Sequence, residues 1–200
     1  MKNETFDTLG YEIVRNAISR ETAELLALEF ELIRNFNFAE NGVDLDTVGF
    51  RNDPQTPASF AMYSAFCFEA LMLKLLPTVE YVTGKKLYPT YSYARIYYKD
   101  AILERHTDRP SCQYSTTITL ESLDDEPWDI WFKDFNGKEK PLRLNVTDMC
   151  VYRGMELDHW REPYTGKRQT QAFLHYVDAD DEYADHRYDR RQGIAGYSKY

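Results

Sequence analysis

Residues 105–109 read Arg-His-Thr-Asp-Arg and place His106 two residues before Asp108. Side chains at positions i and i+2 of a β-strand point to the same face, so this imidazole and this carboxylate would project together. Such a pair, completed by one distant histidine, forms a facial triad for Fe(II) that leaves coordination positions open. The segment therefore predicts two ligands of a metal site, and the rest of the chain must supply the third.

The chain contains four histidines, of which His159 follows a predicted strand around Val151. Arg168 comes nine residues later and opens the last long strand. Alternation along that strand puts Arg168 and Thr170 on one face and His175 on the other, where we expect a structural histidine. A guanidinium offers a planar pair of donors and a hydroxyl adds one more, so Arg168 with Thr170 suits a carboxylate ligand.

The elements that must position these residues follow from periodicity and turn signals. We expect a strand over 10–18, a helix over 19–34 packed on a sheet, a loop over 36–58, and a helix over 59–76 that Pro77 interrupts and Gly84 caps. Further strands are expected near 91–98, 115–120, 128–132, 142–146, 149–152 and 168–177. Helices followed by several short strands predict an α+β fold that is mainly β, a sandwich or barrel with helices against one face.

Composition excludes several classes of protein. Hydrophobic residues make up 43% of the 200-residue chain, which excludes a disordered polymer. A net charge of −9 without a basic cluster argues against a nucleic-acid partner. The three cysteines are widely spaced and odd in number, as free thiols of a reducing compartment would be. With no signal peptide and no membrane-spanning stretch, we expect a cytoplasmic protein.

The combined motif resembles that of the 2-oxoglutarate- and Fe(II)-dependent dioxygenases. His-x-Asp at 106–108, His159 and Arg-x-Thr at 168–170 match that family, and the chain is most similar to its prolyl-4-hydroxylase-like branch over roughly 80–178. The resemblance implies a double-stranded β-helix (jelly roll) with N-terminal helices packed on one sheet. We expect a single domain over residues 1–200, with a helical support at about 19–84, a core at about 87–177 and a polar tail at 178–200.

The resemblance also implies roles for individual residues. His106, Asp108 and His159 would bind iron, and Arg168 would bind the distal carboxylate of 2-oxoglutarate. Five further residues would line the co-substrate pocket: Thr170, Tyr97, Tyr98, Ser115 and Thr119. The cofactors implied are Fe(II), with 2-oxoglutarate and O₂ as co-substrates and ascorbate as an additional reductant.

The residues that flank the iron ligands have two readings. Arg105, Arg109 and Arg161 could bind an anionic substrate, or they could form salt bridges with nearby acids. Trp160 could wall a substrate groove or pack in the core. We predict that Arg109, Arg161 and Trp160 contact the substrate.

The reaction implied is hydroxylation of a C–H bond with release of succinate and CO₂. By resemblance the first candidate substrate is a residue of a protein or peptide, with proline foremost. A small molecule such as a free amino acid comes second, and the acidic net charge places a nucleic-acid demethylase third. A non-catalytic jelly-roll binding module that has kept a metal is the alternative from another class. The sequence does not predict the oligomeric state.

Overall fold

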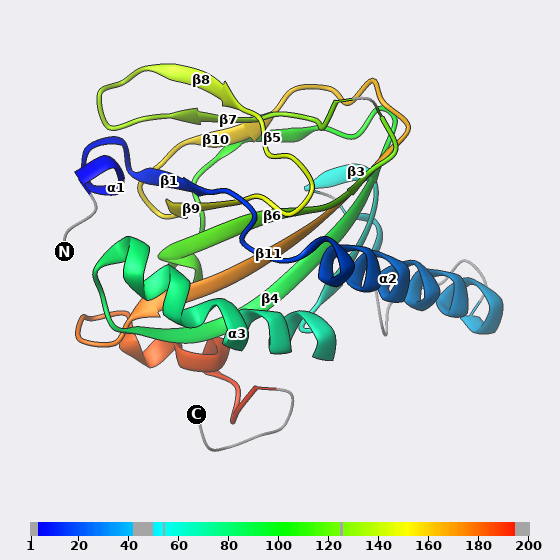
Figure 1. Cartoon of the computed structure of the whole chain (residues 1–200). Coiled ribbons are helices and arrows are strands. Elements are labelled where there is room, and N and C mark those ends of the chain that lie inside the picture. Colours follow the sequence, from blue (N-terminus) through cyan, green and yellow to red (C-terminus); the bar gives the residue numbers. More distant parts are fainter. Residues whose placement is uncertain (1–3, 42–49, 54, 125, 195–200) are drawn as a thin grey trace.

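Two β-sheets lie face to face, and the long helices cover only the outer face of the larger one (Figure 1). The computed structural model describes residues 4–41, 50–53, 55–124 and 126–194. The larger sheet has seven strands, in the order β1 (Tyr11–Val14), β9 (Met149–Arg153), β6 (Tyr114–Ser122), β11 (Arg168–Asp178), β4 (Leu87–Tyr98), β3 (Thr56–Tyr63) and β2 (Phe50–Asp53). The smaller sheet has four, in the order β5 (Leu103–His106), β10 (His159–Arg161), β7 (Ile130–Lys133) and β8 (Glu139–Leu142).

From β4 onward the chain crosses repeatedly between the two sheets, and all strand pairs are antiparallel. This is the double-stranded β-helix expected from the resemblance. Alternation along each strand sorts the side chains: on β11, Ala172 and Leu174 join the apolar core beneath the helices, whereas Phe173 and His175 face the smaller sheet. The space between the sheets is called the barrel interior below.

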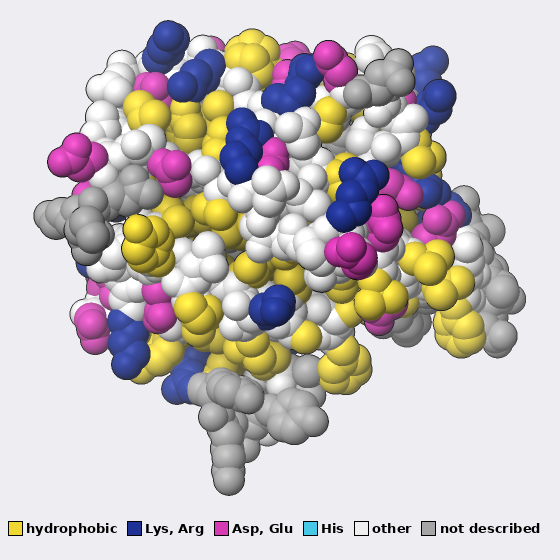
Figure 2. Space-filling view, in the orientation of Figure 1, with side chains coloured by type: hydrophobic (Ala, Val, Ile, Leu, Met, Phe, Trp, Pro, Cys, Tyr) yellow, Lys and Arg dark blue, Asp and Glu magenta, His cyan; other side chains and the backbone are white. Residues whose placement is uncertain are grey.

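Three helices complete the support: α1 (Glu4–Leu9), α2 (Arg20–Asn41) and α3 (Phe66–Thr83). Phe30 of α2 packs against Phe60 and Phe68, each with a ring-centroid distance of 5.4 Å, so α2 lies on the sheet as predicted. The buried stripe is narrower than the apolar one, because Leu28 and Leu32 remain exposed. Figure 2 shows hydrophobic side chains on the surface in the region of α2. None of the helices in the described part of the chain combines the length and apolar composition that crossing a bilayer requires.

The expected loop at 36–58 and the expected start of the second helix at 59 are wrong. Residues 50–53 and 56–63 form a β-hairpin instead, and the helix begins only at Phe66. Phe60 to Tyr63 look helical by composition, but β3 pairs with β4 over this stretch, and tertiary pairing outweighs local propensity. Residues 42–49 lie outside the described part. Pro77 does not interrupt α3, which continues to Thr83 with Leu75 and Val79 buried on either side of the proline, and Gly84 caps it in the left-handed conformation as predicted.

The other strand boundaries differ by a few residues from those expected. β1 ends at Val14, four residues earlier than predicted, because the chain turns there toward α2. The strand expected at 142–146 is instead β8, which ends at Leu142. Gly137 lies in the β7–β8 turn with φ of 76°, a conformation that favours glycine.

Candidate metal centre

His106, Asp108 and His159 converge at one end of the barrel interior. His106 ends β5 and pairs directly with His159, the first residue of β10. The Nε2 atoms of His106 and His159 lie 3.8 and 3.7 Å from Asp108 Oδ1, and the two imidazole centroids are 4.3 Å apart. One donor atom from each residue lies within 4.8 Å of the other two. Two imidazoles and one carboxylate in this arrangement fit a divalent metal of the Fe(II) type, with room for further ligands.

Both imidazoles are oriented by the backbone. The Nδ1 atom of His106 lies 2.7 Å from the carbonyl oxygen of Glu104, and Nδ1 of His159 lies 3.0 Å from that of Leu157. Donation from Nδ1–H to these carbonyls leaves each Nε2 lone pair free for a metal. Burial lowers the pKa of His159, which favours the neutral imidazole that metal binding requires.

Asp108 is fixed by residues that the sequence analysis did not connect with it. Ser115 donates its hydroxyl to Asp108 Oδ2 over 2.8 Å, and the Asp108 amide donates to the carbonyl of Gly154 over 2.8 Å. A Cβ atom at Gly154 would overlap with the Asp108 carboxylate and the carbonyl of Cys112. Glycine is therefore required directly after β9, and Ser115 holds the carboxylate of Asp108 in place here. The turn after a strand was the only available sequence signal for Gly154.

The triad opens onto a cavity of about 260 Å³ lined by both sheets. Aromatic side chains form much of its wall: Tyr63, Tyr91, Tyr93, Tyr152 and Phe173. Gln55 reaches in from the hairpin, with Nε2 3.3 Å from His106 Nε2 and with Oε1 accepting a hydrogen bond from Arg95 over 2.8 Å. The cavity thus accommodates a polar group next to the triad.

His175 lies on the face of β11 opposite Arg168, as predicted, and this face lines the cavity. It shares a 2.9 Å contact between Nδ1 and Ser115 Oγ, and it packs on the ring of Tyr91 at 4.5 Å. Burial lowers the pKa of His175 to about 4. Cys112 is buried beside it, 3.0 Å from the Tyr91 hydroxyl, and like the other two cysteines it is a free thiol.

Arg168 and Thr170 do not face the triad, and the prediction that they bind the co-substrate is wrong. Their face of β11 is the outer one, toward α2, where Arg168 forms ion pairs of 2.9 Å with Glu31 and with Glu121. The Thr170 hydroxyl also donates to Glu121, over 3.3 Å. Alternation grouped the residues of β11 correctly, but the face that reaches the triad is the one carrying His175.

The remaining predicted pocket residues divide between the two faces. The Tyr98 hydroxyl accepts a hydrogen bond from Arg34 of α2 and therefore lies on the outer face. Tyr97 is fully buried on the inner face. Thr119 is also inside, where it donates to the carbonyl of Leu144 and accepts from Gln171 over 2.9 Å. Tyr97 and Thr119 thus remain compatible with a pocket in the barrel interior.

The arginines near the triad have different surroundings. Arg105 is an exposed surface residue that pairs with Asp158 and Glu139 and lies over the ring of Trp160. Trp160 points away from its neighbour His159 and stacks on Trp131, so it does not line the cavity. Arg109 does line the cavity, and Arg161 is buried in the barrel interior.

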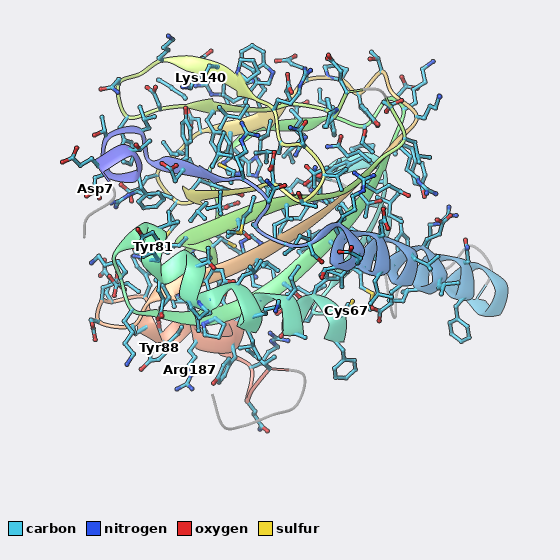
Figure 3. The ribbon with its side chains drawn as sticks, viewed as in Figure 1. Asp7, Cys67, Tyr81, Tyr88, Lys140 and Arg187 are labelled. Atoms are coloured by element: carbon cyan, nitrogen blue, oxygen red, sulfur yellow. The ribbon has the colours of Figure 1, made fainter. Side chains whose placement is uncertain are left out.

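The tail contacts two residues of the cavity wall. In the segment Ala184–Arg190, at a kink between its two 3₁₀ turns, Asp189 accepts hydrogen bonds from Arg109 over 2.7 Å and from the Tyr63 hydroxyl over 2.7 Å. Tyr188 and Asp189 both have φ of 55°, a conformation that costs energy in residues with a side chain. Arg187 anchors the segment over the ring of Tyr88, 4.7 Å from its centroid (Figure 3).

No family model matches the sequence, and neither does any curated protein. Solved structures match well. A prolyl-4-hydroxylase from Pseudomonas putida superposes with a TM-score of 0.62 at 14% identity, covering 88% of this chain and 96% of that one. HygX from Streptomyces hygroscopicus, with nickel, 2-oxoglutarate and hygromycin B bound, gives 0.66 at 15%, covering 88% and 85%. A Trichoplax adhaerens prolyl hydroxylase in complex with a hypoxia-inducible-factor peptide gives 0.63 at 12%, covering 89% and 88%. At these identities the likeness shows the fold, which confirms the predicted double-stranded β-helix.

Proposed function

We propose that this protein is an Fe(II)- and 2-oxoglutarate-dependent oxygenase that hydroxylates a C–H bond. The observation that carries the proposal is the convergence of His106, Asp108 and His159, with donor atoms within 4.8 Å of one another, at the edge of an aromatic cavity. The three protein ligands would leave coordination positions of Fe(II) open for the co-substrates. Solved structures of similar fold that carry nickel or iron with 2-oxoglutarate support the same cofactors.

The residues of this chain have separate tasks in that reaction. His106, Asp108 and His159 hold the metal, and the carboxylate offsets part of its charge. When bound, the metal with 2-oxoglutarate and O₂ supplies the oxidant for the C–H bond. Ser115 and the Gly154 carbonyl hold Asp108 in its orientation. The aromatic wall, including Tyr152 and Phe173, keeps the reacting atoms away from bulk water.

A peptide residue, proline first, is the leading substrate class because of the resemblance to prolyl hydroxylases. A small molecule such as a free amino acid is the second candidate, and one observation favours it. Arg95 lines the triad cavity, where its guanidinium suits the carboxylate of such a molecule. Succinate formation with prolyl peptides and with free amino acids, measured side by side, distinguishes the two classes.

The proposal is tested by adding Fe(II) and 2-oxoglutarate to the protein without oxygen. We expect a visible charge-transfer band from the metal–keto acid complex, and succinate once O₂ is admitted. His106→Ala should remove both signals and weaken metal binding by more than about 100-fold, since even the partners that orient metal ligands are worth 10- to 100-fold. His186→Ala is the matched control, because it removes the one histidine that lies outside the triad and outside the cavity wall.

A wild-type protein that binds Fe(II) but gives neither the band nor succinate would contradict the proposal. That outcome would favour the non-catalytic metal-binding module. Full retention of the band in His106→Ala would instead show that other residues hold the metal.

A further inference from the structure

We propose that Arg161, on the strand of the distal histidine, receives the distal carboxylate of the co-substrate in place of Arg168. The inference rests on the proposed function, because it concerns how the same site holds 2-oxoglutarate. The arginine that binds the carboxylate would then lie on the smaller sheet, whereas Arg168 of the Arg-x-Thr motif lies on the larger one.

Arg161 lies next to the triad on the wall of the barrel interior. It is two residues beyond His159 on β10, so both side chains project into the same space. On one side Arg161 pairs with Leu103 of β5. On the other side is β7, where Trp160 pairs with Trp131, so the next position along β7, Ile130, lies opposite Arg161. Leu103 and Ile130 both line the triad cavity, so Arg161 stands between two cavity residues.

The guanidinium of Arg161 is buried without a counter-ion. The residue is 1% exposed, and among the described residues no carboxylate forms an ion pair with it. Within the described ranges of the chain, it donates one hydrogen bond, to the carbonyl of Trp128, and its Nε has no acceptor. The rings of Trp128 and Tyr97 lie 5.0 and 5.9 Å away. Burying an unpaired charge costs several kcal/mol, so this arrangement is one that an anionic ligand would complete.

The nearby polar atoms fit a carboxylate. The hydroxyl of Tyr97 is buried and has no hydrogen-bond partner in the part of the chain that the structure describes, so it is free to donate to a ligand. The ring of this tyrosine lies 5.9 Å from the guanidinium. Two other arginines already form ion pairs with carboxylates: Arg168 pairs with Glu121, and Arg109 pairs with Asp189. Arg95 donates to Gln55 and lines the cavity, which makes it the rival that the experiment must exclude.

The dimensions agree as well. Positions i and i+2 of a strand are roughly 6.6 Å apart. The two carboxyl carbons of extended 2-oxoglutarate, four C–C bonds apart, are separated by about 5 Å. A keto acid held at the triad through one end would therefore point its other end along β10, toward the residue two positions beyond His159.

The test compares 2-oxoglutarate with 2-oxovalerate, which has the same five carbons but lacks the distal carboxylate. Dissociation constants are measured without oxygen on the Fe(II) protein from the charge-transfer band, and by calorimetry. Wild type should prefer 2-oxoglutarate by roughly 10- to 100-fold, the worth of a hydrogen-bonded charge. Arg161→Gln should weaken 2-oxoglutarate by the same factor, leave 2-oxovalerate unchanged and so abolish the preference.

Three further variants make the outcome specific. Arg168→Gln should keep the wild-type preference, because that arginine faces the helices. Arg161→Lys keeps the cation but not the planar fork, so it should retain part of the preference, and it carries the test should Arg161→Gln fail to fold. Loss of the preference in Arg95→Gln or Arg168→Gln, with retention in the Arg161 variants, overturns the inference.

The inference and the proposed function fail in different ways. If wild type gives no band with either keto acid, the proposed function fails. If wild type binds both keto acids equally well, no cation receives the distal carboxylate, and the inference is wrong while the proposed function stands.

Discussion

The two faces of the seven-stranded sheet are built on different rules. The outer face is apolar, with residues such as Ile96, Ile118 and Leu174 buried beneath α2 and α3, and the charge of Arg168 at its edge is neutralised by two glutamates. The inner face buries hydroxyls, amides and imidazoles, among them Thr117, Gln171 and His175. One sheet thus separates stability from chemistry, and substitutions on its two faces should have separable effects.

The largest effect is expected on the outer face. Phe30→Ala removes a ring that packs against both Phe60 and Phe68, and it should lower the free energy of unfolding by about 3–5 kcal/mol. Metal affinity of the folded protein should stay unchanged, because the triad lies beyond the sheet. Urea unfolding and metal titration measure the two quantities. Leu28→Ala on the exposed side of the same helix is the control, with an expected change within about 0.5 kcal/mol. A large loss of metal affinity in folded Phe30→Ala would show that the two faces are coupled.

The next largest effect is the pH dependence of the stability, which we expect to come from His175 on the inner face. Burial lowers the pKa of His175 from 6.5 to about 4. In the unfolded chain this imidazole is protonated below about pH 6.5, whereas in the folded chain it is protonated only below about pH 4. Stability of the metal-free protein should therefore fall as pH drops through this window, by on the order of 3 kcal/mol from this residue. The free energy of unfolding measured against pH should show a smaller slope in His175→Gln. An unchanged slope in that variant would place the effect on other groups.

The smallest effect concerns how Asp108 is supported. Ser115→Ala removes the hydroxyl that donates to its carboxylate, and metal affinity should fall by about 10-fold. Ser122→Ala, at the far end of the same strand, should leave metal affinity at the wild-type value. Equal affinities in both variants would mean that the backbone alone orients Asp108.

The sequence predicted much of this molecule, and its errors have a common cause. Motif spacing predicted correctly that His106, Asp108 and His159 come together, because such a grouping depends on residue type and on strand alternation. Alternation also separated Arg168 from His175 correctly. It could not tell which of the two faces looks into the barrel, since both faces of β11 are buried and both carry apolar residues. Only the packing of α2 and α3 on one side decides that.

The hairpin of β2 and β3 was missed for a related reason. Phe60 to Tyr63 have the composition of a buried helix, and their partner residues on β4 lie 30 to 36 positions away in the chain. Local patterns carry no information about such a partner. The tail was equally hidden, because the bonds from Asp189 to Arg109 and Tyr63 span 80 and 126 residues of sequence.

The glycine that follows β9 provides a signal by which the candidate metal centre can be sought in other sequences. Glycine has no side chain and is usually ignored in a search for metal ligands. Gly154 lies five positions before His159, and the absence of a Cβ atom there leaves space for the Asp108 carboxylate. A search pattern of His-x-Asp followed by Gly-x₄-His would recover chains that share this local geometry. It requires nothing at position 168, and so it would also find chains whose anion-binding residue lies on another strand.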